Sequence, residues 1–339
     1  MSKLLSKLLK IGLTYDLKDD WKLDSSDPSD ASAEFDLPKT IDSLEKAFSK
    51  KYNVHRIGNV HRLMNIIGNI GVDVVFNITE GRKGRNRESQ VPMLLELFNI
   101  PYIGSDALTM GLTLDKVIAK RIFISEGIPT PEFDVIDDVS EFKFNDIIKF
   151  PIIVKPRYEG SSKSLSKDSI VYFESDLRRQ ALFINQTYNQ PALIEEFIRG
   201  REFTVAVLGN DNAYTLPIIQ IQIDGKLDLG SRFYDYSMIQ SDELQYICPA
   251  QIDINLENKI NELALRVYKA VECKDFGRID FRVDKHDNVY VLEINPLPGL
   301  NDVFLTLANT MNKEYDDILL QILEEGLRRL KMEGKLEKF

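Results

Sequence analysis

The residues best suited to chemistry lie in one short segment near the C-terminal end of the chain. Residues 277–299 read GRIDFRVDKHDNVYVLEINPLPG, and KHDN at 285–288 has the composition of a turn between two strands. A hairpin closed there by a two- or four-residue loop pairs Asp280 with Glu293, and Arg278 with Asn295. Because side chains alternate along a strand, the four polar side chains share one face.

This predicted hairpin is polar on one face and apolar on the other. The apolar face is expected to carry Ile279, Phe281, Val283, Tyr290, Leu292 and Ile294. Two directly opposed carboxylates repel each other unless a cation lies between them. A hard divalent ion, with oxygen ligands from Asp280, Glu293 and Asn295, would meet that need. An ordinary solvated hairpin face with a salt bridge is the alternative, although the stiff NPLPG that follows disfavours it.

The scarce residue types exclude other chemistries. The 339 residues include only two cysteines, Cys248 and Cys273, and three histidines, none of which has a partner four residues away. A disulfide framework, a thiolate zinc site and a helical histidine metal site are therefore not expected. With 43 Lys and Arg against 53 Asp and Glu, the net charge of −10 also disfavours nucleic-acid binding.

Candidate phosphate-binding residues precede the hairpin in the sequence. The segment 157–166, RYEGSSKSLS, combines glycine with serines, whose amides and hydroxyls can hold a phosphate, although a plain flexible loop is an equal reading. Lys155 ends an apolar strand and is costly to bury without an anionic partner. Lys116 reads as a surface lysine of a helix, and Glu195, Glu196 and Glu202 read as ligand acceptors or as a solvated strand edge.

The elements around these residues alternate between strands and helices. Strands are predicted at 10–15, 52–57 and 72–78, with helices between them, which indicates a parallel α/β layer. Further helices are expected at about 114–126, 175–187, 256–271 and 314–333, and the strands of the C-terminal part suit an antiparallel sheet. Eight acidic residues between Asp16 and Asp36 predict an exposed, mobile loop.

With these motifs collected, the chain resembles the D-alanine–D-alanine ligase group of ATP-grasp enzymes. The resemblance covers about residues 72–300 and rests on NIPYIGSD with TLDKVIAK, PIIVKPRYEGSS, LIEEFIRGREFTV, FYDY…CPA and GRIDFR…LEINPLPGL. It implies the ATP-grasp fold, α/β in class and α+β in its C-terminal part. The implied domains are an N-terminal α/β domain at 1–111, a small ATP-grasp domain at 112–187 and a C-terminal ATP-grasp domain at 188–339.

The resemblance also implies a role for each matching residue. Lys116 and Lys155 match the lysines that contact the phosphates of ATP, and Ser161 and Ser162 lie in the loop that covers them, with Ser161 and Arg278 as catalytic residues. Glu195, Phe197 and Ile198 match the hinge that binds adenine, and Glu202 matches the acid that binds ribose. Asp280, Glu293 and Asn295 match ligands of Mg²⁺, with Mn²⁺ as an alternative, and Arg278 matches the arginine that stabilises an oxyanion.

The implied reaction has two steps and small-molecule amino-acid or peptide substrates. A substrate carboxylate attacks the γ-phosphate of ATP, and an amine then displaces phosphate from the resulting acylphosphate to form an amide. A cytoplasmic enzyme is expected, because lysines interrupt the N-terminal MSKLLSKLLK and it lacks the apolar core of a signal peptide. The resemblance also suggests a homodimer. No transmembrane segment is expected, since no apolar run reaches the length of a membrane span.

The chain departs from the family where the amino-acid substrates are bound. GLTYDLKDD replaces a Gly/Ser/Glu motif after the first strand, and SMIQ (237–240) replaces a Lys-Tyr pair in the closing loop. The family has a serine that binds the second alanine, and the corresponding position of this chain lies near Phe304. In place of His-Gly and Glu-Asp-Gly, EGRKGRNRES offers Glu80, Arg85, Arg87 and Glu88 as substrate-binding candidates, suited to an acidic or larger zwitterionic substrate.

Four functions are considered for this pattern. A carboxylate–amine ligase with altered substrates agrees best, because the ATP and metal positions are kept while the recognition positions differ. A genuine D-alanine–D-alanine ligase with unusual recognition residues is the nearest alternative. A nucleotide-binding regulatory module without catalysis is a third, and a membrane-associated scaffold that uses MSKLLSKLLK is the least favoured.

Overall fold

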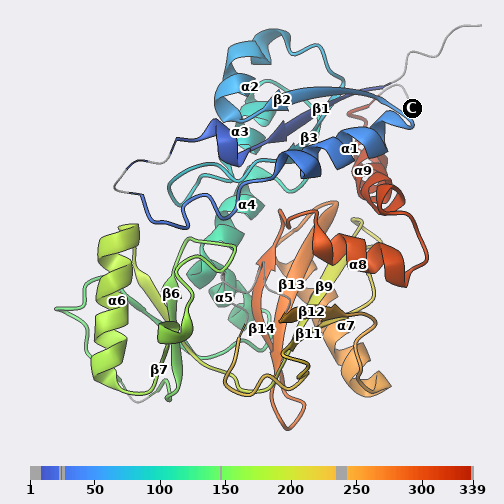
Figure 1. Cartoon of the computed structure of the whole chain (residues 1–339). Helices are drawn as coiled ribbons and strands as arrows, with labels where there is room; N and C mark the ends of the chain where they lie inside the picture. Colours follow the sequence, from blue (N-terminus) through green and yellow to red (C-terminus); the bar gives the residue numbers. More distant parts are fainter. Residues whose placement is uncertain (1–8, 23, 25–26, 146, 234–242, 337–339) are drawn as a thin grey trace, which may run out of the picture.

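Three β-sheets and the helices around them make up the part of the chain that the structure describes (Figure 1). The computed structural model describes residues 9–22, 24, 27–145, 147–233 and 243–336. Two short helices, α4 (Ala107–Leu114) and α5 (Lys116–Ser125), follow the first sheet and are capped by Asp106 and Asp115. Within the described ranges no helix is both long enough and apolar enough to cross a membrane.

The N-terminal sheet is parallel, as predicted, in the order β2-β1-β3-β4. Its strands are β1 (Lys10–Tyr15), β2 (Asn53–Gly58), β3 (Val74–Ile78) and β4 (Tyr102–Ile103). The helices are α1 (Pro38–Ser49), α2 (Val60–Ile66), α3 (Gln90–Leu97) and α9 (Tyr315–Met332). Helices α1 and α9 share one apolar cluster with the sheet, and α2 and α3 share another, so both faces are covered.

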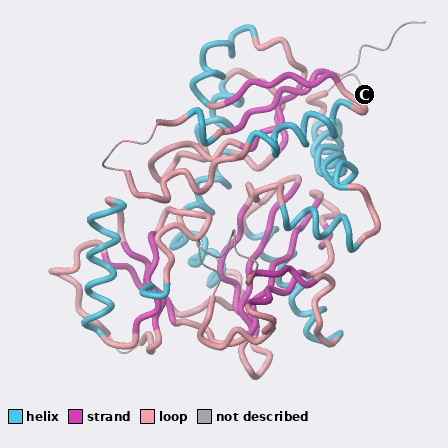
Figure 2. Tube along the Cα trace, in the orientation of Figure 1, coloured by secondary structure: helices cyan, strands magenta, loops and turns pink. Residues whose placement is uncertain are grey.

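The middle sheet is antiparallel, in the order β5-β8-β6-β7. Its strands are β5 (Phe133–Ile136), β6 (Ile152–Pro156), β7 (Ile170–Val171) and β8 (Ala192–Glu196). Helix α6 (Glu174–Tyr188) packs its apolar face on this sheet and lies beside it in Figure 2. Strand β8 belongs to this sheet, although it follows the predicted boundary at residue 187; the domain boundaries themselves stay a prediction.

The C-terminal sheet is antiparallel, as expected, in the order β12-β11-β9-β13-β14 with β10 beside β9. Its strands are β9 (Arg201–Leu208), β10 (Tyr214–Thr215), β11 (Ile219–Ile223), β12 (Leu244–Ile247), β13 (Phe276–Val283) and β14 (Val289–Asn295). Helix α7 (Ile254–Ala270) packs on one face; α8 (Asp302–Thr310), which the sequence analysis did not predict, joins α9 on the other. Short 3-10 turns are η1 (Lys18–Asp20), η2 (Ile67–Asn69) and η3 (Lys167–Ser169).

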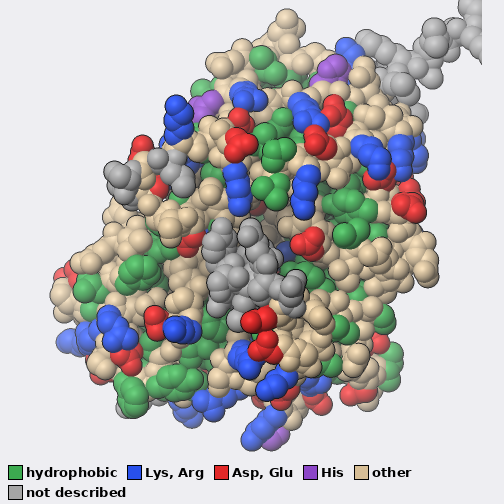
Figure 3. All heavy atoms as spheres, in the orientation of Figure 1, with side chains coloured by type: hydrophobic (Ala, Val, Ile, Leu, Met, Phe, Trp, Pro, Cys, Tyr) green, Lys and Arg blue, Asp and Glu red, His purple; other side chains and the backbone are tan. Residues whose placement is uncertain are grey.

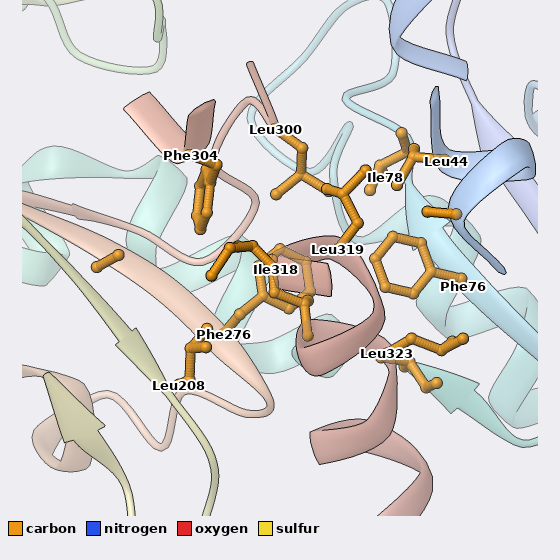
Figure 4. Packing of buried hydrophobic residues seen from close by; sticks show 14 of the residues in the cluster. Leu44, Phe76, Ile78, Leu208, Phe276, Leu300, Phe304, Ile318, Leu319 and Leu323 are labelled. Atoms are coloured by element: carbon orange, nitrogen blue, oxygen red, sulfur yellow. The ribbon is translucent and has the colours of Figure 1, made fainter. Parts of the chain in front are cut away.

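One hydrophobic core joins the first sheet to the last. Phe76 of β3 stacks on Phe276 of β13, with ring centroids 5.8 Å apart and planes 4° from parallel. Phe48 of α1 meets Phe76 edge-on, and Leu319 and Leu323 of α9 complete the contact (Figure 4). The N-terminal sheet and the sheet that carries the predicted metal ligands are therefore held together by shared apolar packing.

We expect Phe276→Ala to lower the free energy of unfolding by about 3–5 kcal/mol, because the wholly buried ring fills space between two sheets. Urea denaturation followed by fluorescence and circular dichroism measures this loss. Phe173→Ala is the matched control, since that ring is 68% exposed and its loss costs less than about 0.5 kcal/mol. Equal denaturation midpoints for the two variants would contradict a shared core.

Candidate active site

The predicted pairing of the two polar strands is confirmed. In the β13–β14 ladder Arg278 lies opposite Asn295, and Asp280 lies opposite Glu293. Two carboxylates, an amide and a guanidinium therefore lie on neighbouring strands. Asp280 and Arg278 also line a pocket together with Glu202 of β9 and Tyr246 of β12.

The register does not continue as predicted beyond Asp280. The ladder shifts by one residue, so that Phe281 pairs with Val291 and Leu292 is left without a partner in it. This β-bulge changes which side chains of β14 face the core: Val289 and Val291 are buried there, whereas Tyr290 and Leu292, which were predicted to be, are only half-buried. The constant register failed because a bulge inserts one extra residue, and bulges are frequent next to active sites.

Each of the two opposed carboxylates already contacts a cation. The Glu293 carboxylate lies 3.1 Å from the Lys116 ammonium, and the Asp280 carboxylate lies 3.2 Å from the Arg278 guanidinium. Asp280 also accepts a hydrogen bond of 2.5 Å from the Thr204 hydroxyl. The Asn295 side-chain oxygen accepts a 2.8 Å bond from the backbone N–H of Leu297, which fixes the amide at the end of the strand.

Lys116 is not the surface lysine that the sequence suggested. Its residue is 9% exposed, because α5 packs against the C-terminal sheet and directs the side chain to Glu293. Burial opposes ionisation of Glu293, but Lys116 and Lys155 outweigh burial and lower the pKa of Glu293 to about 2. The carboxylate is therefore fully ionised at neutral pH, as an ion ligand must be.

The donor set on the hairpin fits a small hard cation. Asp280, Glu293 and Asn295 supply only oxygen, the donor type that Mg²⁺ prefers. The described ranges hold no group of three or more acidic, histidine or cysteine side chains that could enclose an ion by itself. A site with two carboxylates suits Mg²⁺, which usually completes its coordination with water and substrate phosphates.

The predicted need of Lys155 for an anionic partner is confirmed. Its ammonium lies 2.7 Å from one oxygen of Glu195, whose residue is 1% exposed. The other oxygen of Glu195 lies 2.6 Å from Lys120, a wholly buried lysine that the sequence analysis did not single out. Burial would raise the pKa of Glu195, but the two lysines lower it. The spacing of Lys116 and Lys120, one helical turn apart, was the available signal.

The remaining hinge residues lie around a second ion pair. Glu202 contacts Arg282 at 3.2 Å, and the Arg282 guanidinium lies 4.8 Å from the centre of the Phe197 ring. Burial raises the pKa of Glu202 although Arg282 opposes this. Phe197 is buried and Ile198 half-buried in the link from β8 to β9.

The predicted phosphate loop has an unusual backbone. Ser161, Ser162 and Ser164 all have left-handed φ angles, of 47°, 56° and 65°. Such angles are uncommon for residues other than glycine and cost energy unless the surroundings hold them. Ser161 is exposed and Ser162 is half-buried, so surrounding contacts must hold the loop mainly through its other residues.

Those contacts come from the acidic N-terminal segment. One oxygen of Glu34 accepts 2.7 Å bonds from the backbone N–H of Gly160 and from the Arg87 guanidinium, and the other oxygen pairs with Lys163 at 2.5 Å. Asp30 accepts a 2.7 Å bond from the backbone N–H of Ser164. The expectation of an exposed, mobile loop is therefore wrong for this part, which crosses to the middle sheet (Figure 1). Glu34 is paired with two buried cations, and Asp30 accepts from a backbone N–H and from the Tyr188 hydroxyl.

The arginines proposed for substrate binding are engaged by the protein. Arg87 is 2% exposed and donates a 2.6 Å bond to the carbonyl of Tyr158 in addition to its pairing with Glu34. Arg85 lies 2.8 Å from Asp115. Because protein groups already pair with both guanidiniums, the arginines give little support to an acidic substrate. Figure 3 shows that basic and acidic side chains are also interleaved on the visible face of the molecule.

The acids of the same loop are less well paired. Glu88 is 7% exposed, and its carboxylate lies 3.8 Å from Arg87, beyond hydrogen-bond distance. Burial raises the pKa of Glu88 to about 7; Arg87, Lys116 and Lys163 lower it, and Glu34 raises it further. Burial, with the charge of Glu88, raises the pKa of Glu80 well above its ordinary value.

Two predicted recognition positions do not contribute to this cluster. Phe304 of α8 is wholly buried in the main hydrophobic core, so its side chain is part of the packing. The SMIQ segment at 237–240 and most of the preceding FYDY lie outside the described residues, as do residues 1–8 of the N-terminal MSKLLSKLLK.

Comparisons with known proteins agree with this geometry. Residues 122–324 match the protein family described as "D-ala D-ala ligase C-terminus". The chain is 33% identical over 301 residues to the D-alanine–D-alanine ligase of Carboxydothermus hydrogenoformans. That alignment covers 85% of this chain and 93% of the relative. It is 34% identical over 258 residues to the uncharacterized protein y4sG of Sinorhizobium fredii, over 76% of this chain and 75% of the relative.

A solved structure extends the likeness to the whole fold. The D-alanine–D-alanine ligase of Bacillus anthracis, crystallised with ATP, superposes with a TM-score of 0.72 at 26% identity. The superposition covers 97% of this chain and 100% of that one.

We expect Glu34→Gln to lower the free energy of unfolding by about 3 kcal/mol at neutral pH, because Arg87 and Lys163 lose a buried counter-charge. Arg87 and Lys163 outweigh burial and lower the pKa of Glu34 to about 2 from an ordinary 4.5, so its stabilisation is present above about pH 4.5 and is lost as the pH falls towards 2. The difference between wild type and variant should therefore shrink on acidification, as measured by urea denaturation at several pH values.

Glu45→Gln is the matched control for this measurement. Glu45 pairs with Arg56 on the surface, where its side chain is 38% exposed, so the substitution costs less than about 1 kcal/mol. A difference for Glu34→Gln that is no larger than this, or that does not change with pH, would contradict the central role of Glu34.

Proposed function

Because the chain belongs to the D-alanine–D-alanine ligase family and is an ATP-dependent carboxylate–amine ligase, we propose that it joins amino-acid or peptide substrates other than two free D-alanines, with Mg²⁺ as the metal. The observation that carries the proposal is the pairing of Asp280 with Glu293, with Lys116 on Glu293 and Lys155 on Glu195. The proposal also rests on the resemblance, in which the ATP and metal positions match those of the family while the positions that would recognise two D-alanines carry other residues.

In the proposed arrangement two lysines bind the nucleotide phosphates. Lys116 is held by the Glu293 carboxylate, and Lys155 by the Glu195 carboxylate. A phosphate that entered between them would receive two charge-assisted hydrogen bonds from groups that are already desolvated. The amides of the loop around Ser161 and Ser162 would cover the same phosphates, and Glu34 keeps that loop in place.

The metal ligands in this proposal are Asp280, Glu293 and Asn295. When bound, Mg²⁺ would offset charge on the phosphoryl group that moves from ATP to the substrate carboxylate. Arg278, fixed by Asp280, would supply positive charge beside the acyl carbon. There the amine attacks, an oxyanion develops and phosphate leaves as the C–N bond forms.

Glu80 and Glu88 are proposed to bind the ammonium group of a substrate. They lie on the loop that follows β3, at the carboxyl end of the parallel sheet, where such sheets place ligands. The charge of Lys116 lowers the pKa of Glu88, and the same ammonium contacts Glu293. The loop is therefore coupled electrostatically, through Lys116, to one of the proposed metal ligands. Arg85 and Arg87 are paired within the protein, and the raised pKa values of Glu80 and Glu88 reflect burial without a sufficient counter-charge. An ammonium group that bound here would supply that charge and favour the ionised carboxylates.

The substrate proposal is tested by ADP release from purified protein with Mg²⁺. We expect little turnover with D-alanine alone and faster turnover when other amino acids or dipeptides are supplied. Fast turnover on D-alanine alone, with none on other amines, would instead indicate a genuine D-alanine–D-alanine ligase. Tight ATP binding with no ADP release from any pool would indicate a nucleotide-binding module without catalysis.

We expect Asp280→Ala and Glu293→Ala each to abolish ADP release while the circular dichroism spectrum stays that of the wild type, because each removes one of the two carboxylates proposed for the metal. Glu257→Ala, which removes an exposed carboxylate from α7, is the control and should leave turnover unchanged. Undiminished activity in either site variant would refute the metal assignment.

We expect Glu88→Gln to raise KM for the amine-bearing substrate about tenfold or more, because a charged hydrogen-bond acceptor is lost, with little change in KM for ATP. Since the pKa of Glu88 is about 7, the wild-type KM should fall as the pH rises through neutrality, and this trend should be absent in the variant. Glu96→Gln, an exposed acid of α3, is the control for both measurements. An equal pH trend in Glu88→Gln would assign the titration to another group.

A further inference from the structure

Lys120 is a buried cation that the proposed reaction does not yet use. Its residue is wholly buried on α5, and its ammonium lies 2.6 Å from both a Glu195 oxygen and the Thr130 hydroxyl. The same ammonium lies 5.6 Å from the centre of the Phe133 ring. Burying an ammonium costs several kcal/mol unless it is paired, so its presence here calls for an explanation.

Glu195 is shared between two lysines that differ in accessibility. One carboxylate oxygen meets Lys120 and the other meets Lys155, which leaves one positive charge uncompensated in this trio. The side chain of Lys155 is 11% exposed, against 1% for Lys120. An incoming anion can therefore attract Lys155, whereas Lys120 is enclosed and stays with Glu195.

Lys120 also connects Glu195 to the strand that carries the proposed metal ligand. The Thr130 hydroxyl, which accepts from Lys120, donates a 2.8 Å bond to the carbonyl of Val291. The backbone N–H of Val291 donates a 2.8 Å bond to the carbonyl of Pro129, and Val291 is two residues from Glu293 on β14. Lys116 and Lys120, one turn apart on α5, thus contact the acids of two different sheets.

We propose that Lys120 is a positioning residue, which keeps Glu195 ionised and oriented towards the nucleotide base while Lys155 turns to the phosphates. The inference rests on the proposed function, since it takes Glu195 as the acid that meets adenine. Lys120 itself contacts neither the base nor the phosphates in this arrangement. It acts through Glu195. When Lys155 moves to the phosphates, Lys120 remains as the cation that pairs with the buried Glu195 carboxylate.

Two consequences follow for a protein without Lys120. Lys155 would be the remaining partner in the trio and would be retained by Glu195, which weakens phosphate binding. Glu195 would also take up a proton more readily, because one of the cations that lowers its pKa is gone. An ionised carboxylate accepts from the amino group of adenine, whereas a protonated one can donate to the carbonyl that guanine carries there, so discrimination between the bases should fall.

The test is isothermal titration calorimetry of ATP and of GTP against the full chain. For Lys120→Met we expect the dissociation constant for ATP to rise about tenfold or more, and the preference for ATP over GTP to shrink by a similar factor. Arg121→Met, the next residue on α5 and exposed, is the matched control and should leave both constants unchanged. Unchanged ATP affinity and base preference in Lys120→Met would overturn the inference.

A second variant covers the case in which Lys120→Met does not fold. Lys120→Gln removes the charge but keeps a hydrogen-bond donor towards Glu195 and the Thr130 hydroxyl, so we expect a smaller loss of stability, with base preference still reduced. A wild-type preference in Lys120→Gln would overturn the inference. A wild-type protein that binds neither nucleotide would overturn the proposed function itself, which separates the two failures.

Discussion

Two carboxylates that face each other across β13 and β14 set the main constraint on this protein. Asp280 and Glu293 lie directly opposite in the ladder, and such a pair is tolerated only with positive charge close by. Arg278 on the same sheet and Lys116 on α5 supply that charge. The position of α5, the length of the strands and the bulge after Asp280 all serve to bring these groups together.

The same balance of charge recurs at each part of the proposed nucleotide site. Glu195 meets two lysines, Glu202 meets Arg282, and Glu34 meets Arg87 and Lys163. In each case a buried acid lies next to a cation, and at Glu195 one of the cations, Lys155, is a group that a phosphate could also engage. Ligand binding can then exchange one ionic partner for another and need not create a charge in a dry interior, which is the costlier process.

The sequence predicted what depends on local pattern. The pairing of Asp280 with Glu293 was predicted, although in the structure it depends on the bulge that follows Asp280. The parallel N-terminal sheet followed from the alternation of strands and helices, and the need of Lys155 for an anionic partner from the cost of burial. These features are determined by residues close together in the chain, or by one residue in an apolar strand. The motifs shared with ATP-grasp ligases extended the prediction to the whole fold.

What could not be predicted depends on long-range packing. The bulge at Leu292 changes the face of three neighbouring residues, yet nothing in the alternation of the sequence marks it. Lys116 was predicted to be exposed because the sequence of its helix gives no information about the sheet against which that helix packs. The acidic segment looked solvated because its partners, Arg87 and Lys163, lie more than fifty and more than one hundred residues further along the chain.

That last contact limits how far the chain can be treated as modular. The part that matches the ligase C-terminal family begins at residue 122, whereas Glu34 and Asp30, which hold the loop around Gly160 and Ser164, belong to the segment before the first helix. A fragment that began at the family boundary would keep the serines of the loop and lose the carboxylates that restrain them. A segment that precedes the family match is therefore attached to a loop within it, and substitutions in one can alter the other.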